Sequence, residues 1–361
     1  MSLFGQTAAA ASSAASTTQG DLKNDVELTQ PPEDSVSDLA FSSKADLLAV
    51  SSWDKKVRIY EISPTGQSQG KAIYDHEAPV LSVVWSKDGT KVVSGGADKA
   101  VRMFDLGSMQ TTQVAAHDMP IKCVRFIEHP QAGQMLVTGS WDKTLKYWDL
   151  RQPTAAATLP LQERCYTLDV AQSLMVVGTA ERYINIVNLQ NPQTIYKTMQ
   201  SPLKWQTRVV SCFPNASGFA VGSIEGRCAI QYVEEKDNHL NFSFKCHREN
   251  PPNQRDVTNV YSVNAISFHP TYGTFSTAGS DGTFHFWDKD AKHRLKGYPN
   301  VGGTISATTF NGVGSIFAYA VSYDWSKGYQ ANTPQYPIKV MLHPIKEDEA
   351  KPRPTNTAKK R

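Results

Sequence analysis

The stretch "TGSWDKTLKYWDL" (residues 138–150) contains the pattern that decides the fold. Small residues lead into an acidic turn at Asp142. After the turn, polar and apolar side chains alternate from Thr144 to Trp148, with the period of two that is typical of a β-strand. The stretch therefore predicts two strands joined by a tight turn that carries an aspartate.

The same cassette occurs six more times along the chain. The other copies are "SSWDKKVRIYEI" (51–62), "SGGADKAVRMFDL" (94–106), "GTAERYINIVNL" (178–189), "VGSIEGRCAIQYV" (221–233), "AGSDGTFHFWDK" (278–289) and the altered "AVSYDWSKGY" (320–329). The turn acids are Asp54, Asp98, Asp142, Glu181, Glu225, Asp281 and Asp324. A period of roughly 40–45 residues with a Trp-Asp signature is typical of WD-repeat propellers, which have four strands per blade. Seven acids predict an all-β, seven-bladed WD-repeat β-propeller with short disordered tails.

The ends of the chain supply the closing strand and the tails. We expect "DVELT" (25–29) to form the outer strand of the last blade, next to "PIKVML" (337–342), because this pairing removes the exposed edges of a linear array. The predicted organisation is a disordered Ala/Ser/Thr-rich tail with one Phe-Gly pair at 1–24, a propeller at 25–345 and a basic tail at 346–361.

Composition narrows the classes of function. The formal net charge is +3, and the tail at 346–361 accounts for all of it, so a nucleic-acid role cannot rest on net charge. The chain has five cysteines, an odd number without metal-ligand spacing, which favours a reduced, intracellular compartment. It has no apolar run long enough to span a bilayer and no secretory signal.

The His, Ser or Thr, and Asp residues of the repeat resemble a catalytic triad only on paper. In blade three the candidates for a buried hydrogen-bond chain are His117, Thr138 or Ser140, Asp142 and Trp148. Because similar residues recur in other blades, we interpret them as structural groups that satisfy one another in the interior.

Blade five departs from this pattern. Its turn acid is Glu225, Gln231 stands where blade three has Trp148, and Arg227 begins the third strand. One interpretation is sequence drift, with Arg227 as a solvated residue at the rim. The other is that the turn has been given over to partner binding.

Two cationic stretches lie near this turn in the sequence. The expected outer strand of blade five, "NFSFKCHREN" (241–250), interleaves Phe242, Phe244, Lys245, His247 and Arg248. The stretch "WDKDAKHRLKGY" (287–298), which leaves blade six, carries Lys289, Lys292, His293, Arg294 and Lys296. Aromatic rings interleaved with cations suit an acidic peptide or single-stranded nucleic acid. Arg227 follows a second-to-third-strand turn and the second stretch follows the end of a third strand, which suggests opposite rims. One continuous patch is the alternative.

Several motifs together resemble the nuclear-pore mRNA export propellers of the Rae/Gle group. They are "GSIEGRCAIQY" (222–232), "FKCHRE" (244–249), "VNAISFHPTYGTFSTAGSDG" (263–282), "WDKDAKHRLK" (287–296), "YAVSYDWSKG" (319–328) and the "MSLFG" start. The resemblance covers essentially the whole chain. It implies a seven-bladed protein that binds a short nucleoporin segment, the GLEBS motif, through the arginine of "SIEGR", Arg227. It also implies a part in mRNA export, a nuclear and nuclear-pore location with some cytoplasmic protein, and a mitotic spindle role.

A second group shares part of this signature. The mitotic-checkpoint propellers, which bind GLEBS-like segments of checkpoint kinases, also have "SIEGR", "FKCHR" and "LTQPPED" (28–34). The motifs "SYDWSKG" (322–328) and "WDKDAKHRLK", with the Phe-Gly start, favour the export group. A checkpoint propeller is the alternative prediction.

The predicted function is a non-catalytic interaction platform. The residues predicted to bind the nucleoporin are Arg227, Arg294, Glu225, Lys245 and Arg248, and those predicted to bind single-stranded RNA are Phe244, Trp287, Lys289, Lys292 and Lys296. A guanidinium can hold a carboxylate through two parallel hydrogen bonds, which suits the two arginines to acidic side chains. We expect no cofactor, metal or small-molecule substrate. Cys246 and His247 are adjacent on a strand and therefore point to opposite faces, so they form no nucleophile–base pair.

Overall fold

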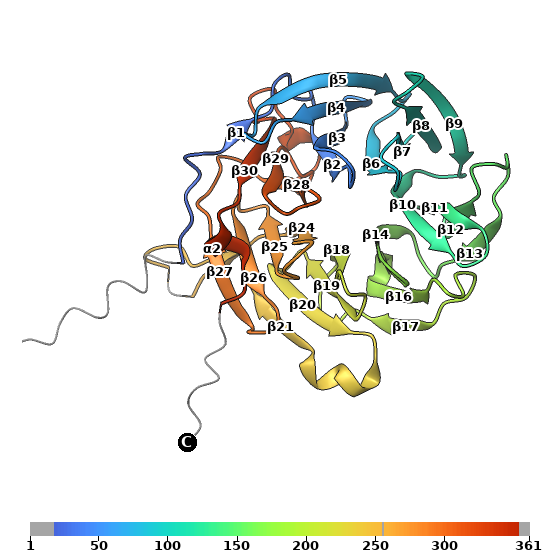
Figure 1. The fold of residues 1–361 in the computed structure, drawn as a ribbon. Helices are drawn as coiled ribbons and strands as arrows, with labels where there is room; N and C mark the ends of the chain where they lie inside the picture. The colour runs from blue at the N-terminus through green and yellow to red at the C-terminus, as the bar shows by residue number, and fades with distance from the viewer. Residues whose placement is uncertain (1–17, 255, 354–361) are drawn as a thin grey trace, which may run out of the picture.

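The computed structural model describes residues 18–254 and 256–353, which form a ring of seven four-stranded antiparallel sheets (Figure 1). The predicted seven-bladed propeller is confirmed. In every blade the turn acid lies between the second and third strands, as the repeat predicts. The parts of the predicted tails at 1–17 and 354–361 lie outside the described residues.

Within blades one to six, the strands follow chain order from the central channel to the outside. Blades one to three contain β2 (Val36–Phe41), β3 (Leu47–Ser52), β4 (Lys56–Ile62), β5 (Ser68–Asp75); β6 (Val80–Trp85), β7 (Lys91–Gly96), β8 (Ala100–Asp105), β9 (Gln110–Ala116); and β10 (Ile121–His129), β11 (Gly133–Ser140), β12 (Thr144–Trp148), β13 (Ala157–Pro160). Blades four to six contain β14 (Cys165–Ala171), β15 (Leu174–Thr179), β16 (Tyr183–Asn188), β17 (Lys197–Gln200); β18 (Thr207–Cys212), β19 (Gly218–Ser223), β20 (Arg227–Tyr232), β21 (Phe242–Lys245); and β24 (Val263–Phe268), β25 (Phe275–Gly279), β26 (Phe284–Asp288), β27 (His293–Gly297).

Blade seven joins the two ends of the chain. It contains β28 (Ile305–Phe310), β29 (Ile316–Val321), β30 (Lys339–Pro344) and, on the outside, β1 (Val26–Glu27). Val26 lies opposite Leu342 in an antiparallel register, and Figure 1 shows β1 next to β30. The predicted closing strand is therefore confirmed. Leu28, 1% exposed, packs in the same buried cluster as Leu342.

A buried ion cluster reinforces this closure. The imidazole of His343 lies between the carboxylates of Asp25 and Glu349, with nitrogen–oxygen distances of 2.6 Å and 3.3 Å. Tyr319 donates a hydroxyl hydrogen bond of 2.6 Å to Asp25. Burial opposes the charged imidazole, but the hydrogen bonds and charges of the two carboxylates outweigh burial and raise the pKa of His343 to about 9. The charged imidazole thus ties both ends of the chain to blade seven.

Packed structure continues into both segments assigned to the tails. Helix α2 (Glu347–Ala350) lies within 346–361, and its Glu349 and Ala350 are buried. At the other end, the backbone N–H of Gly20 donates to the carbonyl of Gly297 over 2.9 Å. The propeller boundaries expected at 25 and 345 are therefore too narrow, because residues outside them also contact blades six and seven.

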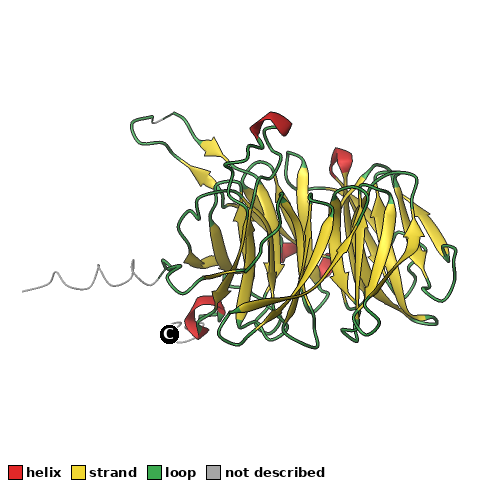
Figure 2. Cartoon of the chain, turned by 90° about the horizontal axis from the view of Figure 1, so that it is seen from above, coloured by secondary structure: helices red, strands yellow, loops and turns green. Residues whose placement is uncertain are grey.

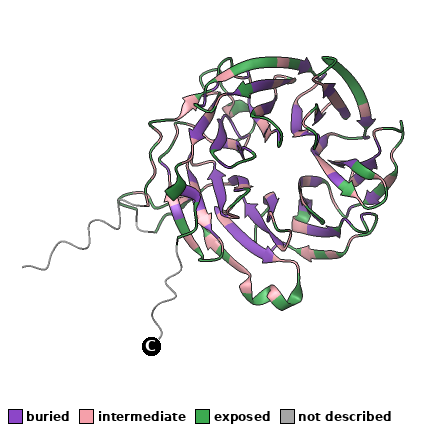
Figure 3. Ribbon diagram, in the orientation of Figure 1, coloured by how far each residue is buried: buried purple, intermediate pink, exposed green. Residues whose placement is uncertain are grey.

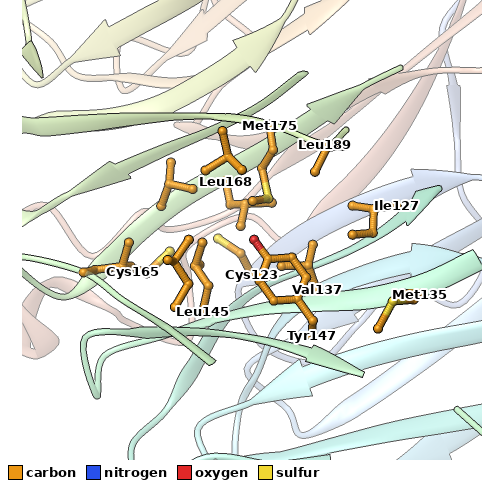
Figure 4. Close-up of a cluster of buried hydrophobic side chains, with 14 residues drawn as sticks. Cys123, Ile127, Met135, Val137, Leu145, Tyr147, Cys165, Leu168, Met175 and Leu189 are labelled. Atoms are coloured by element: carbon orange, nitrogen blue, oxygen red, sulfur yellow. The ribbon is translucent and has the colours of Figure 1, made fainter. Parts of the chain in front are cut away.

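Neighbouring blades are held together by buried apolar side chains. Figure 4 shows the cluster between blades three and four, in which Cys123 and Cys165 lie among Leu, Val, Ile, Met and Tyr side chains. All five cysteines are free thiols, and only Cys246 is not fully buried. Figure 3 shows mostly buried residues on the inner strands and far more exposure on the outermost ones.

The two faces of the ring differ. We call the rim that carries the seven turn acids the turn rim and the opposite one the far rim. A two-stranded hairpin, β22 (Arg248–Glu249) and β23 (Asn259–Val260), links blades five and six. Figure 2 shows this hairpin projecting beyond one rim, with α2 near the opposite one. Within the described residues, no helix is long and apolar enough to cross a membrane.

Replacing His343 with Gln should reduce the dependence of stability on alkaline pH. The pKa of His343 is raised in the folded protein, so its contribution is full below about pH 6.5 and is lost as the pH rises toward 9. That contribution is on the order of 3 kcal/mol. Melting temperatures between pH 6 and pH 9.5 should fall more steeply for the parent than for His343→Gln. The control is His239→Gln at an exposed site, and parallel pH profiles for parent and His343→Gln would contradict the expectation.

Candidate functional site

Blades three and six tie the turn acid to the third strand through a buried hydrogen-bond chain. In blade three, His117 lies 2.7 Å from the carboxylate of Asp142 and 2.6 Å from the hydroxyl of Thr138. The indole of Trp148 donates to the same hydroxyl over 2.9 Å. Thr138, and not Ser140, belongs to the chain. The predicted structural role of these residues is confirmed.

Blade six contains the same chain, and His247 belongs to it. This histidine lies 2.9 Å from Asp281 and 3.0 Å from Thr277, and the indole of Trp287 donates to Thr277 over 2.9 Å. The sequence pattern placed His247 among the cations of the outer strand. That prediction was wrong, because the side chain is fully buried and serves the next blade.

The neighbouring thiol is equally unsuited to catalysis. Burial raises the pKa of Cys246 to about 12, so the nucleophilic thiolate is scarce at neutral pH. His247 already has partners on both ring nitrogens. The pair therefore offers no activated nucleophile.

Blade five lacks the chain altogether. Val221 stands four residues before the turn acid, where blade three has the hydroxyl of Thr138. The buried Gln231 donates its amide to the backbone carbonyl of Ile230 over 2.9 Å. Glu225 instead accepts the backbone N–H of Lys204 over 3.2 Å. The turn acid of blade five is thus not tied to a His–Thr–Trp chain as it is in blades three and six.

The turn of blade five is built to receive the hairpin that follows it. Arg248 donates two hydrogen bonds, of 3.1 Å and 2.7 Å, to the carbonyl of Glu225. Gly226 has a φ of +62°, and a Cβ there would lie 2.3 Å from the carbonyl oxygen of His247. The approach of the hairpin therefore explains the glycine. It also engages Arg248 and Glu225, two predicted nucleoporin-binding residues, within the protein.

Arg227 and Lys245 form a like-charged pair. They lie directly opposite each other across β20 and β21, and Lys245 is exposed. In blade one the equivalent pair is Lys56 and Asp75, whose charged atoms are 3.0 Å apart. Like charges directly opposite on a sheet are destabilising. Within the described residues, no hydrogen bond or ion pair engages either side chain.

Arg294 supplies a third free cation, on the outer strand of blade six. Its backbone pairs with Trp287, and its guanidinium lies close to Gly297, toward His285. Burial, followed by the charges of His247 and Arg294, lowers the pKa of His285 to about 3. The imidazole next to the guanidinium is therefore neutral, and the exposed Arg294 has no ion-pair partner in the described part of the chain.

The two arginines lie on opposite sides of β20 and β21. Alternation places Arg227 on the face of Ala229, which packs against blade four. Arg294 pairs with Trp287, whose ring packs 4.5 Å from that of Phe244 on the face toward blade six. A segment that contacts both arginines must therefore cross the outer edge of blade five.

The residues predicted to bind RNA are only partly available. Lys289 lies 2.7 Å from Asp290, and Lys296 lies 3.1 Å from Asp348; each lysine side chain is about a tenth exposed. Lys292 is exposed and lies over the ring of Phe242 at 5.0 Å.

The two predicted aromatic residues, Phe244 and Trp287, are half-buried, and the indole N–H of Trp287 is used by Thr277. Arg294 and Lys292 are thus the available cations next to this pair of rings.

Sequence reasoning missed the apolar surface around the turn of blade five. Trp205, Ile224 and Val260 are 61%, 40% and 44% exposed. Ile224 and Val260 line a cavity of about 860 Å³ on the turn rim between blades five, six and seven. The available signal was Ile224 itself, an apolar residue directly before the turn acid.

Comparisons with known proteins agree with the fold. The model of the WD domain, G-beta repeat family matches residues 26–61, 67–105, 108–149 and 255–288. The chain is 66% identical over 359 residues to "mRNA export factor GLE2" of Chaetomium thermophilum, covering 98% of each chain. It is 61% identical to "Poly(A)+ RNA export protein" of Schizosaccharomyces pombe, over 98% of this chain and 99% of that one. It is 47% identical to "Protein Rae1" of Drosophila melanogaster, over 91% and 96%.

Replacing Lys245 with Glu should stabilise the isolated protein. The change converts the like-charged pair with Arg227 into an opposite-charge pair, which is worth about 0.2–1 kcal/mol. Urea unfolding should show a higher midpoint with an unchanged slope. The matched control is Asp75→Lys in blade one, which creates a like-charged pair with Lys56 and should lower the midpoint. A lower midpoint for Lys245→Glu would show that the pair is not under strain.

Proposed function

Because the chain belongs to the Rae/Gle family of WD40 mRNA export propellers, we propose that it is a non-catalytic interaction platform in mRNA export. Its partner is a nucleoporin segment of the GLEBS type, bound at blades five and six. We infer from this partner a location in the nucleus and at the nuclear pore, with some protein in the cytoplasm. A spindle role is a further part of the family-based proposal.

The observation that carries the proposal is the uncompensated charge at blade five. Arg227 and Lys245 face each other without an acid, whereas the equivalent position in blade one has one. Folding alone gains nothing from this arrangement. An acidic segment that lies across the two cations would remove their repulsion and form charge-assisted hydrogen bonds with the guanidinium.

The exposed apolar residues suit the same kind of partner. Trp205, Ile224 and Val260 lie around the turn of blade five, and Tyr261 joins Ile224 and Val260 in the wall of the cavity. Aromatic and aliphatic anchors in a pocket commonly carry most of the binding energy of an interface. A segment that combines acidic with apolar side chains fits these two features together.

Charge reversal at the two arginines should abolish binding of an acidic GLEBS-type peptide. Arg227→Glu combined with Arg294→Glu replaces both guanidinium groups with repelling carboxylates. Removing one partner of a desolvated pair costs roughly 2–5 kcal/mol, and a pair at the rim costs less. Isothermal titration calorimetry measures the affinity. Circular dichroism should stay unchanged, because Arg227 is half-buried and Arg294 is exposed. The melting temperature should not fall, because Arg227→Glu converts the like-charged pair with Lys245 into an opposite-charge pair.

The controls distinguish the loss of specific contacts from a general effect of the changed net charge. Lys99→Glu reverses one exposed cation of blade two, the same change in charge as each single arginine variant, and should leave affinity near that of the parent. The two single variants show whether the peptide crosses blade five, since each arginine lies on a different side of β21. Near-parental affinity of the double variant would contradict the proposal and show that Arg227 does not bind the peptide. A pull-down in which checkpoint kinases replace the nucleoporin would favour the checkpoint alternative.

We also propose weak, salt-sensitive binding of single-stranded RNA next to Phe244 and Trp287. The support is the pair of rings, 4.5 Å apart, with Arg294 and Lys292 free beside them. Lys292→Ala with Arg294→Ala should lower the log–log salt slope of binding by about 0.7 for each phosphate that the variant no longer neutralises. Lys289→Ala with Lys296→Ala should change it less, because Asp290 and Asp348 already neutralise these lysines. An unchanged slope in both variants would exclude this surface.

A further inference from the structure

All seven innermost strands carry a β-bulge at the same place. In each, the register shifts after the first residue, so that the second residue has no partner on the neighbouring strand. The second residues are Ser37, Leu81, Lys122, Tyr166, Arg208, Asn264 and Ser306. Bulges commonly re-aim a side chain, and they are frequent beside functional sites.

The seven bulged residues line one cavity. It has a volume of about 260 Å³, and its wall also includes Trp53, Trp141, Trp325 and Tyr323 from the turn rim. The strands that contribute the bulges, β2, β6, β10, β14, β18, β24 and β28, surround the axis of the ring in Figure 1. The cavity is thus the mouth of the central channel at the turn rim. Its wall does not include Arg227, Lys245 or Arg294, but it shares Gln206, Arg208, Asn264 and Tyr323 with the cavity of about 860 Å³.

The ionisable residues in the wall of this cavity include two cations, Lys122 and Arg208, and one acid, Asp324. Lys122 has no ion pair or hydrogen bond from its side chain within the described residues. Arg208 donates to the backbone carbonyl of Asp324 over 3.0 Å, and burial lowers the pKa of this arginine.

The acid in the wall, Asp324, is engaged on both carboxylate oxygens. It accepts the amide of Asn264 over 2.9 Å and the backbone N–H of Ser326 over 3.1 Å. Within the described residues, no ion pair joins Asp324 to Lys122 or Arg208, although the charge of its carboxylate acts on Arg208.

Polar atoms without partners also gather in the wall. Of the buried side-chain atoms that lack a hydrogen bond in the described part of the chain, four belong to residues of this cavity: Asn264 Oδ1, Thr207 Oγ1, Trp141 Nε1 and Trp325 Nε1. Asn264 is 9% exposed and Thr207 is 1% exposed. Buried polar groups are normally satisfied, so such a concentration points to a missing hydrogen-bonding partner.

We propose that the channel mouth binds a single nucleotide. Arg208 and Lys122 hold the phosphate, and the base lies against the aromatic side chains of the wall, where stacking needs no particular base. Asn264 and Thr207 offer hydrogen-bonding groups to the base or the sugar. A free nucleoside monophosphate and the phosphorylated end of an RNA strand share this chemistry.

The tryptophans of the wall report directly on occupancy. Titration with adenosine and uridine monophosphate should quench the fluorescence of the tryptophans, and calorimetry gives the affinity. Lys122→Gln with Arg208→Gln should weaken binding by about tenfold or more, because neither cation then holds the phosphate. Lys99→Gln, which removes a cation outside the cavity, is the matched control and should bind as the parent does. Circular dichroism checks folding, and Lys122→Gln alone serves if the double variant is unstable.

The remaining outcomes each decide the proposal. Binding of a 3′-phosphorylated oligonucleotide without binding of free nucleotides supports it and identifies an RNA end as the source. Equal affinity for inorganic phosphate overturns it, because the aromatic wall would then contribute nothing. Parental affinity of the double variant, or no binding of any nucleotide or oligonucleotide end, also overturns it. Loss of nucleotide binding in Arg227→Glu would assign the ligand to the peptide surface at blade five and overturn it as well.

Discussion

The pairing of the first strand with the last is the constraint on which the rest of the structure depends. Seven sheets packed in a row would leave one face of the first sheet and one face of the last uncovered, and closure of the ring covers both. Two residues of β1 complete blade seven, and this short pairing gains support from the buried His343 between Asp25 and Glu349. Closure of the ring fixes the positions of the blades, and therefore of the residues on both rims.

Closure leaves the individual blades free to differ. Where the chain of His, Asp, Thr and Trp is present, as in blade three, the turn acid is committed to the interior. In blade five Val221 and Gln231 remove that demand, and Arg248 instead fixes the backbone of the turn from the neighbouring hairpin. The turn remains ordered without its usual side chains, so Arg227 can carry a free charge at a defined position.

The sequence was sufficient to predict the number of blades, because each turn acid marks the turn between two strands. The alternation of polar and apolar residues also shows which side chains share a face of each strand. The sequence also placed Arg227 correctly at the start of a third strand. It failed for His247. This residue follows the last strand of blade five but belongs to the hydrogen-bond chain of blade six, and no local sequence pattern indicates that contact. The clamp of Arg248 on Glu225 depends in the same way on contacts between segments 23 residues apart. Local periodicity cannot reveal such contacts.

The two candidate surfaces follow from one property of repeated folds. Equivalent positions in seven blades have the same backbone geometry, so the scaffold fixes where a side chain points and the residue type alone decides its chemistry. At the third-strand position, blade one has a compensated Lys56 and blade five an uncompensated Arg227. At the bulge position, hydroxyls and an aliphatic side chain share the ring with Lys122 and Arg208. The most informative residues of such a protein are therefore those that differ from the equivalent residues of the other blades without adding stability. The other blades provide the reference for that comparison.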